Sequence, residues 1–368
     1  MDYVGIKEQV RQSTKQFGPQ KDLLLMDNNV LASKHFYKII DEIKECGFER
    51  GATYIPESEY AIAIKNLRDG YNVRAYTKKL IRLYDLISNK LPETEQADFY
   101  LNREKHHLLY SEVATPEAII EFDEIARPLH QKYFKRLKRM RTIDFNQGVD
   151  ARLVTNKKME KLAEINIRPL RFAFDHYSMK DIYEKAIRIA AKHDITDLSN
   201  YLLYNFKDKP DDLYYRMRIN IDLCDELGVT IYSFPMKYHP IDDPNYFYNR
   251  EYIGKHWNRK FIRSIQAVLN ATKGKVGRGK SFFEEAFGGN IDEFYKILWM
   301  PEALIIYRFK YKDNLTAEWW EKYNSLNDVQ LNRLKEIVAL NVFNKTTVTG
   351  DTAVDEVLKY YQVRRDPK

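Results

Sequence analysis

The chain has 368 residues, of which 44% are hydrophobic and 31% are charged, so it can bury a large core and is not disordered by composition. A net charge of +7 suits an anionic substrate or nucleic acid but requires neither. Its two cysteines, Cys46 and Cys224, are far apart, which argues against a disulfide or a self-contained zinc site and suits a cytoplasmic protein. No apolar run approaches the roughly 20 residues that span a bilayer, so we expect no membrane contact.

Residues 1–48 show the pattern helix, strand, helix. Apolar residues at helical spacing predict a helix over 4–17. The apolar run 23–26 has the length of a strand, and a second amphipathic helix, capped by Ser33, is expected to follow it. The polar residues that end this strand are Asp27, Asn28 and Asn29.

Residues 49–140 change this pattern. Helices are expected over 61–67, 76–91 and 116–140, and clear strands are missing. The segment is much longer than an ordinary connection between a strand and a helix. We therefore interpret it as a helical insertion between two strands of the main domain.

The last predicted helix of the insertion is strongly basic. It contains no acid over the fifteen residues that carry Arg127, Lys132, Lys135, Arg136, Lys138, Arg139 and Arg141. An apolar stripe at helical spacing accompanies these cations and consists of Leu129, Tyr133, Leu137 and Met140. Two interpretations stay open: a surface helix with a solvated basic face, or a surface that contacts nucleic acid or another anionic partner.

The stretch 143–153, IDFNQGVDARL, is the clearest of several strands that stop abruptly in polar residues. Gly148 allows the backbone to turn sharply there. The polar residues at this strand end are Asn146, Gln147, Asp150 and Arg152. Further strands of this kind are predicted over 170–176, 199–205 and 229–234. The intervening helices are predicted over 155–165, 179–192 and 211–227.

These five strand-to-helix units predict an α/β fold of parallel strands joined by right-handed crossovers. Ligands of such folds bind at the carboxyl ends of the strands. We expect residues 1–48 and 141–241 to form this domain, with 49–140 inserted into it. Residues 242–368 are expected to form a helical C-terminal region that packs on it.

The C-terminal region contains one further motif. Gly274 to Ser281 matches the phosphate-loop pattern GxxxxGK[ST] letter for letter, but a predicted helix over 261–270 precedes it where a phosphate loop needs a buried strand. A flexible basic loop near an anionic ligand is the favoured interpretation, and a nucleotide-hydrolysing loop stays an alternative. Ser325 and Asp328 resemble a capping box before a last long helix over 329–343.

Together, the strand ends resemble the radical S-adenosylmethionine (radical SAM) superfamily over residues 4–241, the insertion excepted. The resemblance rests on LLLMDNNVLAS, IDFNQGVDARL, LRFAFDH, NYLLYNFKDKPDDLYYR and YSFPMKYHPI. It implies a partial (β/α)6 TIM-like barrel with a [4Fe–4S] cluster and S-adenosylmethionine at its carboxyl face. It also implies reductive cleavage of S-adenosylmethionine to a radical that abstracts hydrogen from a substrate, with the cofactor supplying the chemistry.

The resemblance assigns cofactor contacts to each strand end by position. Contacts to the amino group of the cofactor are assigned to Asp27, Asn28 and Asn29. Contacts to its methionine carboxylate or to the substrate fall to Asn146, Gln147, Asp150 and Arg152. The contact to the ribose is assigned to Asp175, because carboxylates accept hydrogen bonds from hydroxyls. Contacts near the adenine fall to Asn205, Phe206, Lys237 and Tyr238.

One part of the family pattern is missing. The cluster is held by three cysteines in a CxxxCxxC loop after the first strand, and this sequence contains no such loop. We therefore expect a barrel without its first strand. The chain is then part of a longer enzyme, the partner of a separate N-terminal cluster-binding segment, or a cluster-free homologue. The alternative function is an RNA- or anion-binding module that uses Arg127–Arg141 and the loop Lys273–Lys280.

Overall fold

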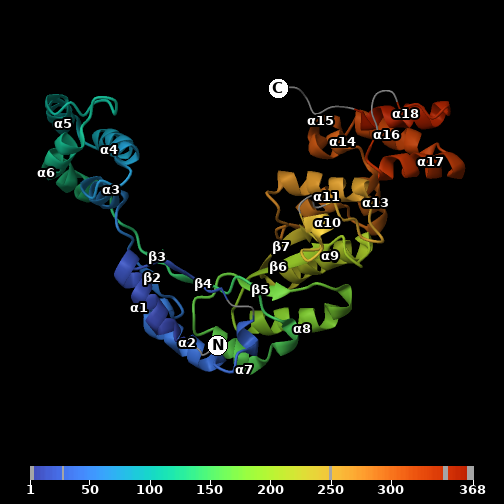
Figure 1. Cartoon of the computed structure of the whole chain (residues 1–368), viewed down its shortest axis with the longest axis horizontal. Helices are drawn as coiled ribbons and strands as arrows, with labels where there is room; N and C mark the ends of the chain where they lie inside the picture. The colour runs from blue at the N-terminus through green and yellow to red at the C-terminus, as the bar shows by residue number, and fades with distance from the viewer. Residues whose placement is uncertain (1–3, 27–28, 248–250, 343–346, 363–368) are drawn as a thin grey trace. The chain divides into compact units, whose positions relative to one another are not determined.

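The computed structural model describes residues 4–26, 29–247, 251–342 and 347–362 (Figure 1). Asp27 and Asn28, two of the predicted site residues, lie outside the described residues. The chain divides into two compact units. The first consists of Met1–Gly18, Asp22–Arg50 and Thr142–Lys368, and the second of Pro19–Lys21 and Gly51–Arg141.

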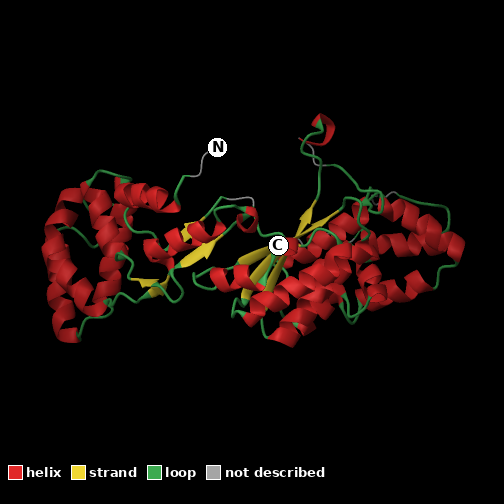
Figure 2. Ribbon diagram, turned by 90° about the horizontal axis from the view of Figure 1, so that it is seen from below, coloured by secondary structure: helices red, strands yellow, loops and turns green. Residues whose placement is uncertain are grey.

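Five parallel strands run through the first unit in two groups, each in chain order. Figure 2 shows the strands of the chain in yellow. They are β1 (Asp22–Leu24), β4 (Thr142–Asp144), β5 (Leu170–Ala173), β6 (Asp197–Tyr204) and β7 (Thr230–Lys237). β1 pairs with β4, and β6 lies between β5 and β7. Two parallel bridges, Ile143 to Ile167 and Val149 to Phe172, join the two groups. The predicted parallel α/β arrangement is confirmed, and within the described residues the strands do not close into a barrel.

Helices connect these strands and cover one face of them. They are α2 (Phe36–Ile43), α7 (Asn156–Leu162), α8 (Lys180–Lys192) and α9 (Pro210–Leu227), with α1 (Ile6–Phe17) packed on α2. In Figure 1, α7, α8 and α9 follow one another along this face. The helix positions agree with the sequence prediction. His35 directly precedes α2 and forms no side-chain cap, while Ser33 Oγ accepts from the backbone N–H of His35 at 3.2 Å just before the helix.

A buried polar network fastens the helices to this face of the strands. Asn200 on β6 donates to the Tyr183 hydroxyl at 2.7 Å, and that hydroxyl donates to Asn220 Oδ1 at 2.7 Å. Asn220 donates in turn to Ser233 Oγ on β7 at 2.8 Å. All four side chains are buried, so each of these hydrogen bonds offsets a desolvation cost that an apolar contact would not incur. The network therefore specifies how α8 and α9 sit on β6 and β7.

The opposite face of the strands is open. Side chains alternate along β6, so Ser199, Tyr201 and Leu203 face away from α8 and α9. Leu24 on β1 and Met236 on β7 are 57% and 49% exposed. Parallel sheets usually have both faces covered, so exposed apolar side chains on this open face mark it as a surface available to a ligand or partner.

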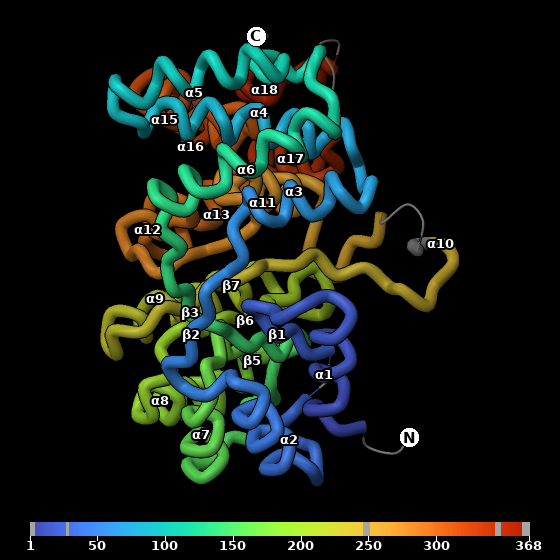
Figure 3. Tube along the Cα trace, turned by 90° about the vertical axis from the view of Figure 1, so that its left-hand side faces the viewer, coloured from blue at the N-terminus to red at the C-terminus, as the bar shows by residue number. Residues whose placement is uncertain are grey.

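The second unit is a small helical bundle with its own core (Figure 3). It contains α3 (Glu59–Arg68), α4 (Val73–Ser88), α5 (Glu93–Lys105) and α6 (Pro116–Tyr133). It also contains an antiparallel pair, β2 (Thr53–Tyr54) and β3 (Arg139–Met140), so the prediction that this segment lacks strands is wrong. The sequence pattern missed α5 because that helix buries only Phe99 and Arg103 among its described side chains.

The predicted basic helix over Arg127–Arg141 is also shorter than expected. α6 ends at Tyr133, and Arg139 belongs to β3, which pairs with β2 from the start of the insertion. Leu137 is 74% exposed and so does not continue an apolar stripe. Arg127 contacts Asp123, one helical turn earlier, at 2.5 Å, so its charge is compensated by an acid that lies just outside the basic run.

The C-terminal part of the first unit is helical. Its elements are α10 (Pro244–Phe247), α11 (Arg259–Ala271), α12 (Lys280–Phe287), α13 (Ile291–Trp299), α14 (Glu302–Ile306), α15 (Arg308–Tyr311), α16 (Leu315–Asn324), α17 (Asp328–Ala339) and α18 (Thr352–Tyr361). A core around Trp319 joins α16, α17 and α18. α17 begins with a capping box formed by Asn327 and Gln330, so the prediction of Ser325 and Asp328 is wrong. Among the described helices, none is long and apolar enough to cross a membrane.

Lys260 on α11 is a buried cation in this helical region. Its Nζ donates to Ser264 Oγ at 2.6 Å and to the carbonyl oxygen of Met300 at 2.5 Å. Burial lowers the pKa of Lys260 from 10.5 to about 7, an effect that Glu302 opposes and Arg263 reinforces. A lysine with this pKa is partly neutral at physiological pH, so its burial costs less than that of a permanently charged group.

The titration of Lys260 predicts how stability changes with pH. Between about pH 7 and 10.5 the unfolded chain binds a proton on Lys260 that the folded chain releases, so unfolding free energy rises with pH in this window. We expect Lys260→Met to remove a rise of about 2 kcal/mol between pH 7 and 9. Guanidinium unfolding followed by tryptophan fluorescence measures this, because all four tryptophans lie in the first unit.

Lys255→Met is the matched control, because Lys255 is exposed in the same segment. It should leave the pH dependence of unfolding as it is in the unaltered protein. Equal pH slopes for the unaltered protein and Lys260→Met would show that Lys260 keeps an ordinary pKa in the folded chain.

Candidate functional site

The carboxyl ends of the five parallel strands lie along one edge of the first unit, and the described residues predicted to bind a cofactor follow these ends. Asn29 follows β1, Asn146 and Gln147 follow β4, and Asp175 follows β5. The remaining pairs are Asp150 and Arg152 around the short helix η3 (Ala151–Leu153), Asn205 and Phe206 after β6, and Lys237 and Tyr238 at the end of β7. The contacts of each pair decide which side chains remain available to a ligand.

The ends of β1 and β4 meet at Asn146. Its Nδ2 lies 3.7 Å from Met26 Sδ, and Met26 is largely exposed beside it. Asn29 follows in the same connection, where its backbone caps the short helix η1 (Val30–Ala32) without a hydrogen bond from its side chain. Its Oδ1 is buried and has no hydrogen-bond partner among the described residues. A buried acceptor in this state is costly by about 1–3 kcal/mol and would gain from a ligand that donates to it.

Asp150 and Arg152 neutralise each other. Arg152 donates to Asp150 from Nε at 2.9 Å and from Nη2 at 2.7 Å. The hydrogen bonds from Arg152 hold the pKa of the Asp150 carboxyl below its usual value. Asp150 Oδ1 also caps η3 by accepting from the backbone N–H of Arg152. Arg152 is 67% exposed, so it could bind a ligand carboxylate only in exchange for this partner.

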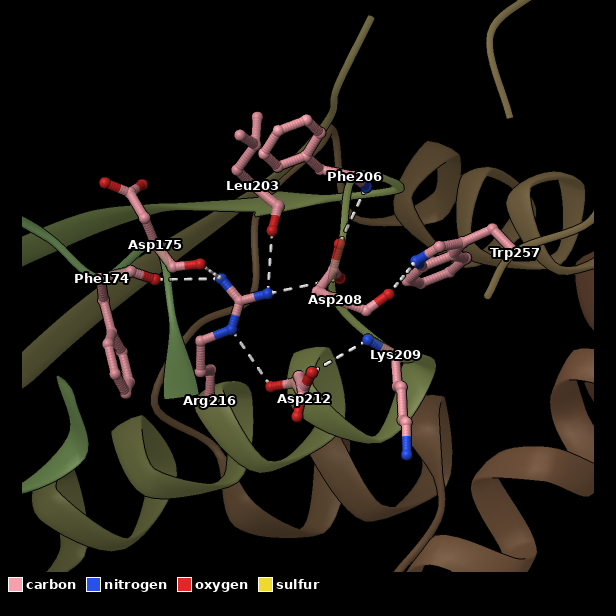
Figure 4. Close-up of polar contacts among 9 residues, drawn as sticks. All are labelled: Phe174, Asp175, Leu203, Phe206, Asp208, Lys209, Asp212, Arg216 and Trp257. Atoms are coloured by element: carbon pink, nitrogen blue, oxygen red, sulfur yellow. Dashed lines mark hydrogen bonds and ion pairs between the residues drawn. The ribbon is translucent and has the colours of Figure 1, made fainter. Parts of the chain in front are cut away.

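Arg216 on α9 fastens the ends of β5 and β6 together (Figure 4). Its side chain is fully buried, and the burial lowers its pKa. Nη1 donates to the carbonyl oxygens of Phe174 at 3.0 Å and Asp175 at 3.1 Å. Nη2 donates to the carbonyl oxygen of Leu203 at 2.8 Å. These carbonyl groups lie just after β5 and near the end of β6, so one guanidinium links the ends of both strands to α9.

Asp208 lies beside Arg216 in the loop after β6. Its Oδ1 accepts from the backbone N–H of Phe206 at 2.9 Å. Its Oδ2 is buried, lies 3.6 Å from Arg216 Nη2, and has no hydrogen-bond partner among the described residues. Burial raises the pKa of this carboxyl above its usual value. The carboxylate of Asp175 differs, because it is exposed and in Figure 4 points away from Arg216.

Asn205 joins the ends of β6 and β7. It adopts a left-handed backbone conformation with φ of +69°. Its Nδ2 donates to the carbonyl oxygens of Tyr238 at 3.1 Å and Tyr252 at 3.0 Å, and its Oδ1 accepts from the N–H of Gly254 at 2.9 Å. The side chain is buried and its amide is engaged, so within this structure Asn205 positions the site and does not present a free group to it.

Phe206 and Tyr238 form an aromatic pair beside Asn205. Their ring centroids lie 4.4 Å apart, and Lys207 Nζ lies 5.2 Å from the Phe206 ring. Both rings are partly buried, as is Lys237 at the end of β7. The pair offers an apolar surface at the ends of β6 and β7.

The sequence analysis missed a polar pair on the open face of the strands. Arg171 on β5 donates to both carboxylate oxygens of Asp144 on β4, at 2.9 and 2.6 Å. Its guanidinium also lies 3.3 Å from Ser199 Oγ and 5.7 Å from the Tyr201 ring, both on β6. The hydrogen bond with Asp144 raises the pKa of Arg171. Charged residues inside strands that are otherwise largely apolar were a signal that could have marked Arg171 and Asp144 individually, though not their pairing.

The cysteines do not fit an iron–sulfur cluster. Cys46 lies in the turn after α2, and Cys224 is buried in α9, where its Sγ accepts from the backbone N–H of Ile231 at 3.3 Å. Burial raises the pKa of the Cys224 thiol, which disfavours the thiolate that a cluster needs. In the part of the chain that the structure describes, no group of three histidine, cysteine or acidic side chains is arranged to hold a metal ion.

The role of Arg216 can be tested by Arg216→Lys. An ammonium cannot reach the carbonyl groups of three residues at once, so we expect unfolding free energy to fall by about 2–4 kcal/mol. Arg218→Lys is the matched control, since Arg218 lies on the same helix and makes partly exposed ion pairs with Asp222 and Glu284. It should cost less than about 1 kcal/mol. Unfolding monitored by tryptophan fluorescence measures both variants. An equal decrease in unfolding free energy for the two would show that Arg216 contributes no more to stability than Arg218.

Comparison of the chain with models of protein families, with curated proteins and with solved structures finds no significant match. A function for the chain therefore rests on its own strand ends. The two features that bear on it most directly are the unpartnered Asn29 Oδ1 and the exposed Asp175 carboxylate.

Proposed function

We propose that the chain is a radical SAM-type protein that binds S-adenosylmethionine at the carboxyl ends of a partial (β/α)6 barrel. The strand order supports the barrel. β1 pairs with β4, and β5, β6 and β7 pair in chain order. Two parallel bridges join these groups, and α2, α7, α8 and α9 follow the successive strands β1, β4, β5 and β6. A doubly wound sheet reverses its strand order at a switch point, whereas a barrel keeps the order of the chain. β1 would then correspond to the second strand of the complete barrel.

The buried Oδ1 of Asn29 carries the proposal for the cofactor. It lies at the strand end where the family resemblance assigns the contact to the amino group of S-adenosylmethionine. An ammonium group has only donors, so it would satisfy an acceptor that has no hydrogen-bond partner among the described residues. Such a hydrogen bond to a charged group contributes about 1.5–3 kcal/mol.

Other described residues fit the remaining parts of the cofactor. Asp175 offers an exposed carboxylate that would accept from ribose hydroxyls. The rings of Phe206 and Tyr238 offer an apolar surface for adenine, while Asn205 holds the two strand ends at a fixed spacing. Gln147 is exposed beside Asn146 and could contact the methionine part or a substrate.

Cys46 and Cys224 do not fit a [4Fe–4S] cluster, so the role of the chain's own residues in this proposal is to bind and orient the cofactor. Reductive cleavage of S-adenosylmethionine would need three cysteines from a separate cluster-binding segment. Neither described cysteine forms a disulfide, which is compatible with the proposed cytoplasmic location.

Isothermal titration of the full chain with S-adenosylmethionine and with 5′-methylthioadenosine tests the proposal. The second compound lacks the amino acid part, so Asn29→Leu should weaken S-adenosylmethionine by roughly 10–100-fold and leave 5′-methylthioadenosine unchanged. Asp175→Asn should weaken both, because both carry the ribose.

Asp225→Asn serves as the control, since Asp225 is exposed in the last turn of α9, far along that helix from the carboxyl ends of the strands. It should leave both affinities as they are. Failure of the folded chain to bind either compound at millimolar concentration would remove the proposal, as would an Asn29→Leu variant that weakens both compounds equally.

A further inference from the structure

A second surface of the first unit has features that the proposed cofactor site does not use. The segment Lys273–Lys280, which we call the cationic loop, connects α11 to α12 and contains no acidic residue. Its four cations are exposed: Lys273, Lys275, Arg278 and Lys280. None of the four forms an ion pair with any residue that the structure describes. Four neighbouring cations without counter-charges make a surface that favours an anionic partner.

The cationic loop is anchored on the edge of β7. Val276 pairs antiparallel with Ser233, with N–O distances of 2.8 and 2.9 Å in the two directions. Its side chain is buried. Arg278 Nη1 also donates to Thr230 Oγ1 at 3.5 Å. The backbone that carries the four cations is therefore held in one place along the strand, which lowers the entropic cost of binding a partner there.

Two exposed aromatic side chains flank these cations. Tyr232 on β7 is 37% exposed, and Lys275 Nζ lies 5.1 Å from the centre of its ring. Phe282 in the first turn of α12 is 48% exposed. Gly279 provides no side-chain cap for α12, so the first backbone N–H groups of that helix are open to an acceptor.

We propose that the cationic loop, together with Tyr232 and Phe282, binds single-stranded nucleic acid. Phosphates would contact the cations and the N-terminus of α12, and unstacked bases would lie on the aromatic rings. Proteins that bind single-stranded nucleic acid combine exposed aromatic rings with cations, because unpaired bases are free to stack on the rings. Bases in a duplex already stack on one another and are not available for this contact. This surface is independent of the cofactor site, so each proposal can fail without the other.

The loop also matches a phosphate-loop pattern, yet its position does not suit a mononucleotide site. A phosphate loop follows a buried parallel strand, whereas this loop follows α11 and meets a strand through the antiparallel bridge at Val276. The loop therefore lies along a strand edge, which suits an extended chain of phosphates.

Fluorescence anisotropy with a labelled single-stranded RNA of twelve nucleotides, measured with the full chain across a range of salt concentrations, tests the proposal. One variant replaces the four loop cations with glutamine: Lys273→Gln, Lys275→Gln, Arg278→Gln and Lys280→Gln. A matched variant removes four exposed cations of the second unit: Lys135→Gln, Arg136→Gln, Lys138→Gln and Arg139→Gln. Both variants lose four positive charges, so a difference in their RNA affinities shows which of the two surfaces binds the RNA.

The loop variant should weaken RNA binding at least tenfold at 100 mM salt and reduce the slope of log affinity against log salt by about 2–3, at roughly 0.7 per phosphate contact. The matched variant should change neither quantity appreciably. A loss confined to the matched variant would place RNA binding in the second unit, and an equal loss in both would indicate non-specific attraction. Either result overturns the proposal.

Tyr232→Leu separates stacking from charge. It should weaken RNA binding about 5–50-fold at every salt concentration and leave the salt slope unchanged. Tyr110→Leu, at an exposed tyrosine of the second unit, is its control. Equal affinity for polyglutamate or for anionic lipid vesicles, or displacement of the RNA by micromolar ATP with magnesium, would overturn the assignment to nucleic acid.

Discussion

The buried guanidinium of Arg216 is the interaction on which the proposed cofactor site depends. Moving an arginine out of water costs several kcal/mol, and this cost is offset only when its donors all find acceptors. Here the acceptors are carbonyl groups at the ends of β5 and β6 and in the first turn of α9. The same guanidinium contacts all three elements. A change that removes it is therefore expected to disturb the strand ends and the packing of α9 together.

This arrangement separates positioning from binding. Arg216 and Asn205 donate their hydrogen bonds to backbone carbonyl oxygens and so hold the strand ends in place. Asp175 lies on one of the ends that are held, whereas Asn29 follows β1, and the side chains of both have acceptors that no described residue engages. Asp208 is intermediate, because one oxygen is engaged by a backbone N–H and the other is buried without a hydrogen bond. Proteins tolerate such unpaired polar atoms mainly where a ligand or a function compensates for them.

The elements that the sequence predicted well are those whose signals are local. β6 was recognised because an apolar run stops in polar residues, and α9 ends at Gly228, which adopts the left-handed conformation that glycine favours. Arg216 was missed because an arginine on an amphipathic helix has no local mark of burial. Arg171 and Asp144 are separated by 27 positions, so nothing nearby indicates that they pair. The basic run after Tyr133 was extended as a helix because its pairing with Thr53 and Tyr54 is likewise non-local.

The β2–β3 ribbon changes what the insertion means for folding. The N–H of Arg141 donates to the carbonyl oxygen of Ala52 at 2.9 Å, so the chain leaves and re-enters the second unit at neighbouring points. A long flexible loop between β1 and β4 would impose an entropic penalty on their pairing. The second unit has its own core and its two ends meet at the β2–β3 ribbon, so in the folded protein the connection between β1 and β4 is closed at its base and is not a long flexible loop.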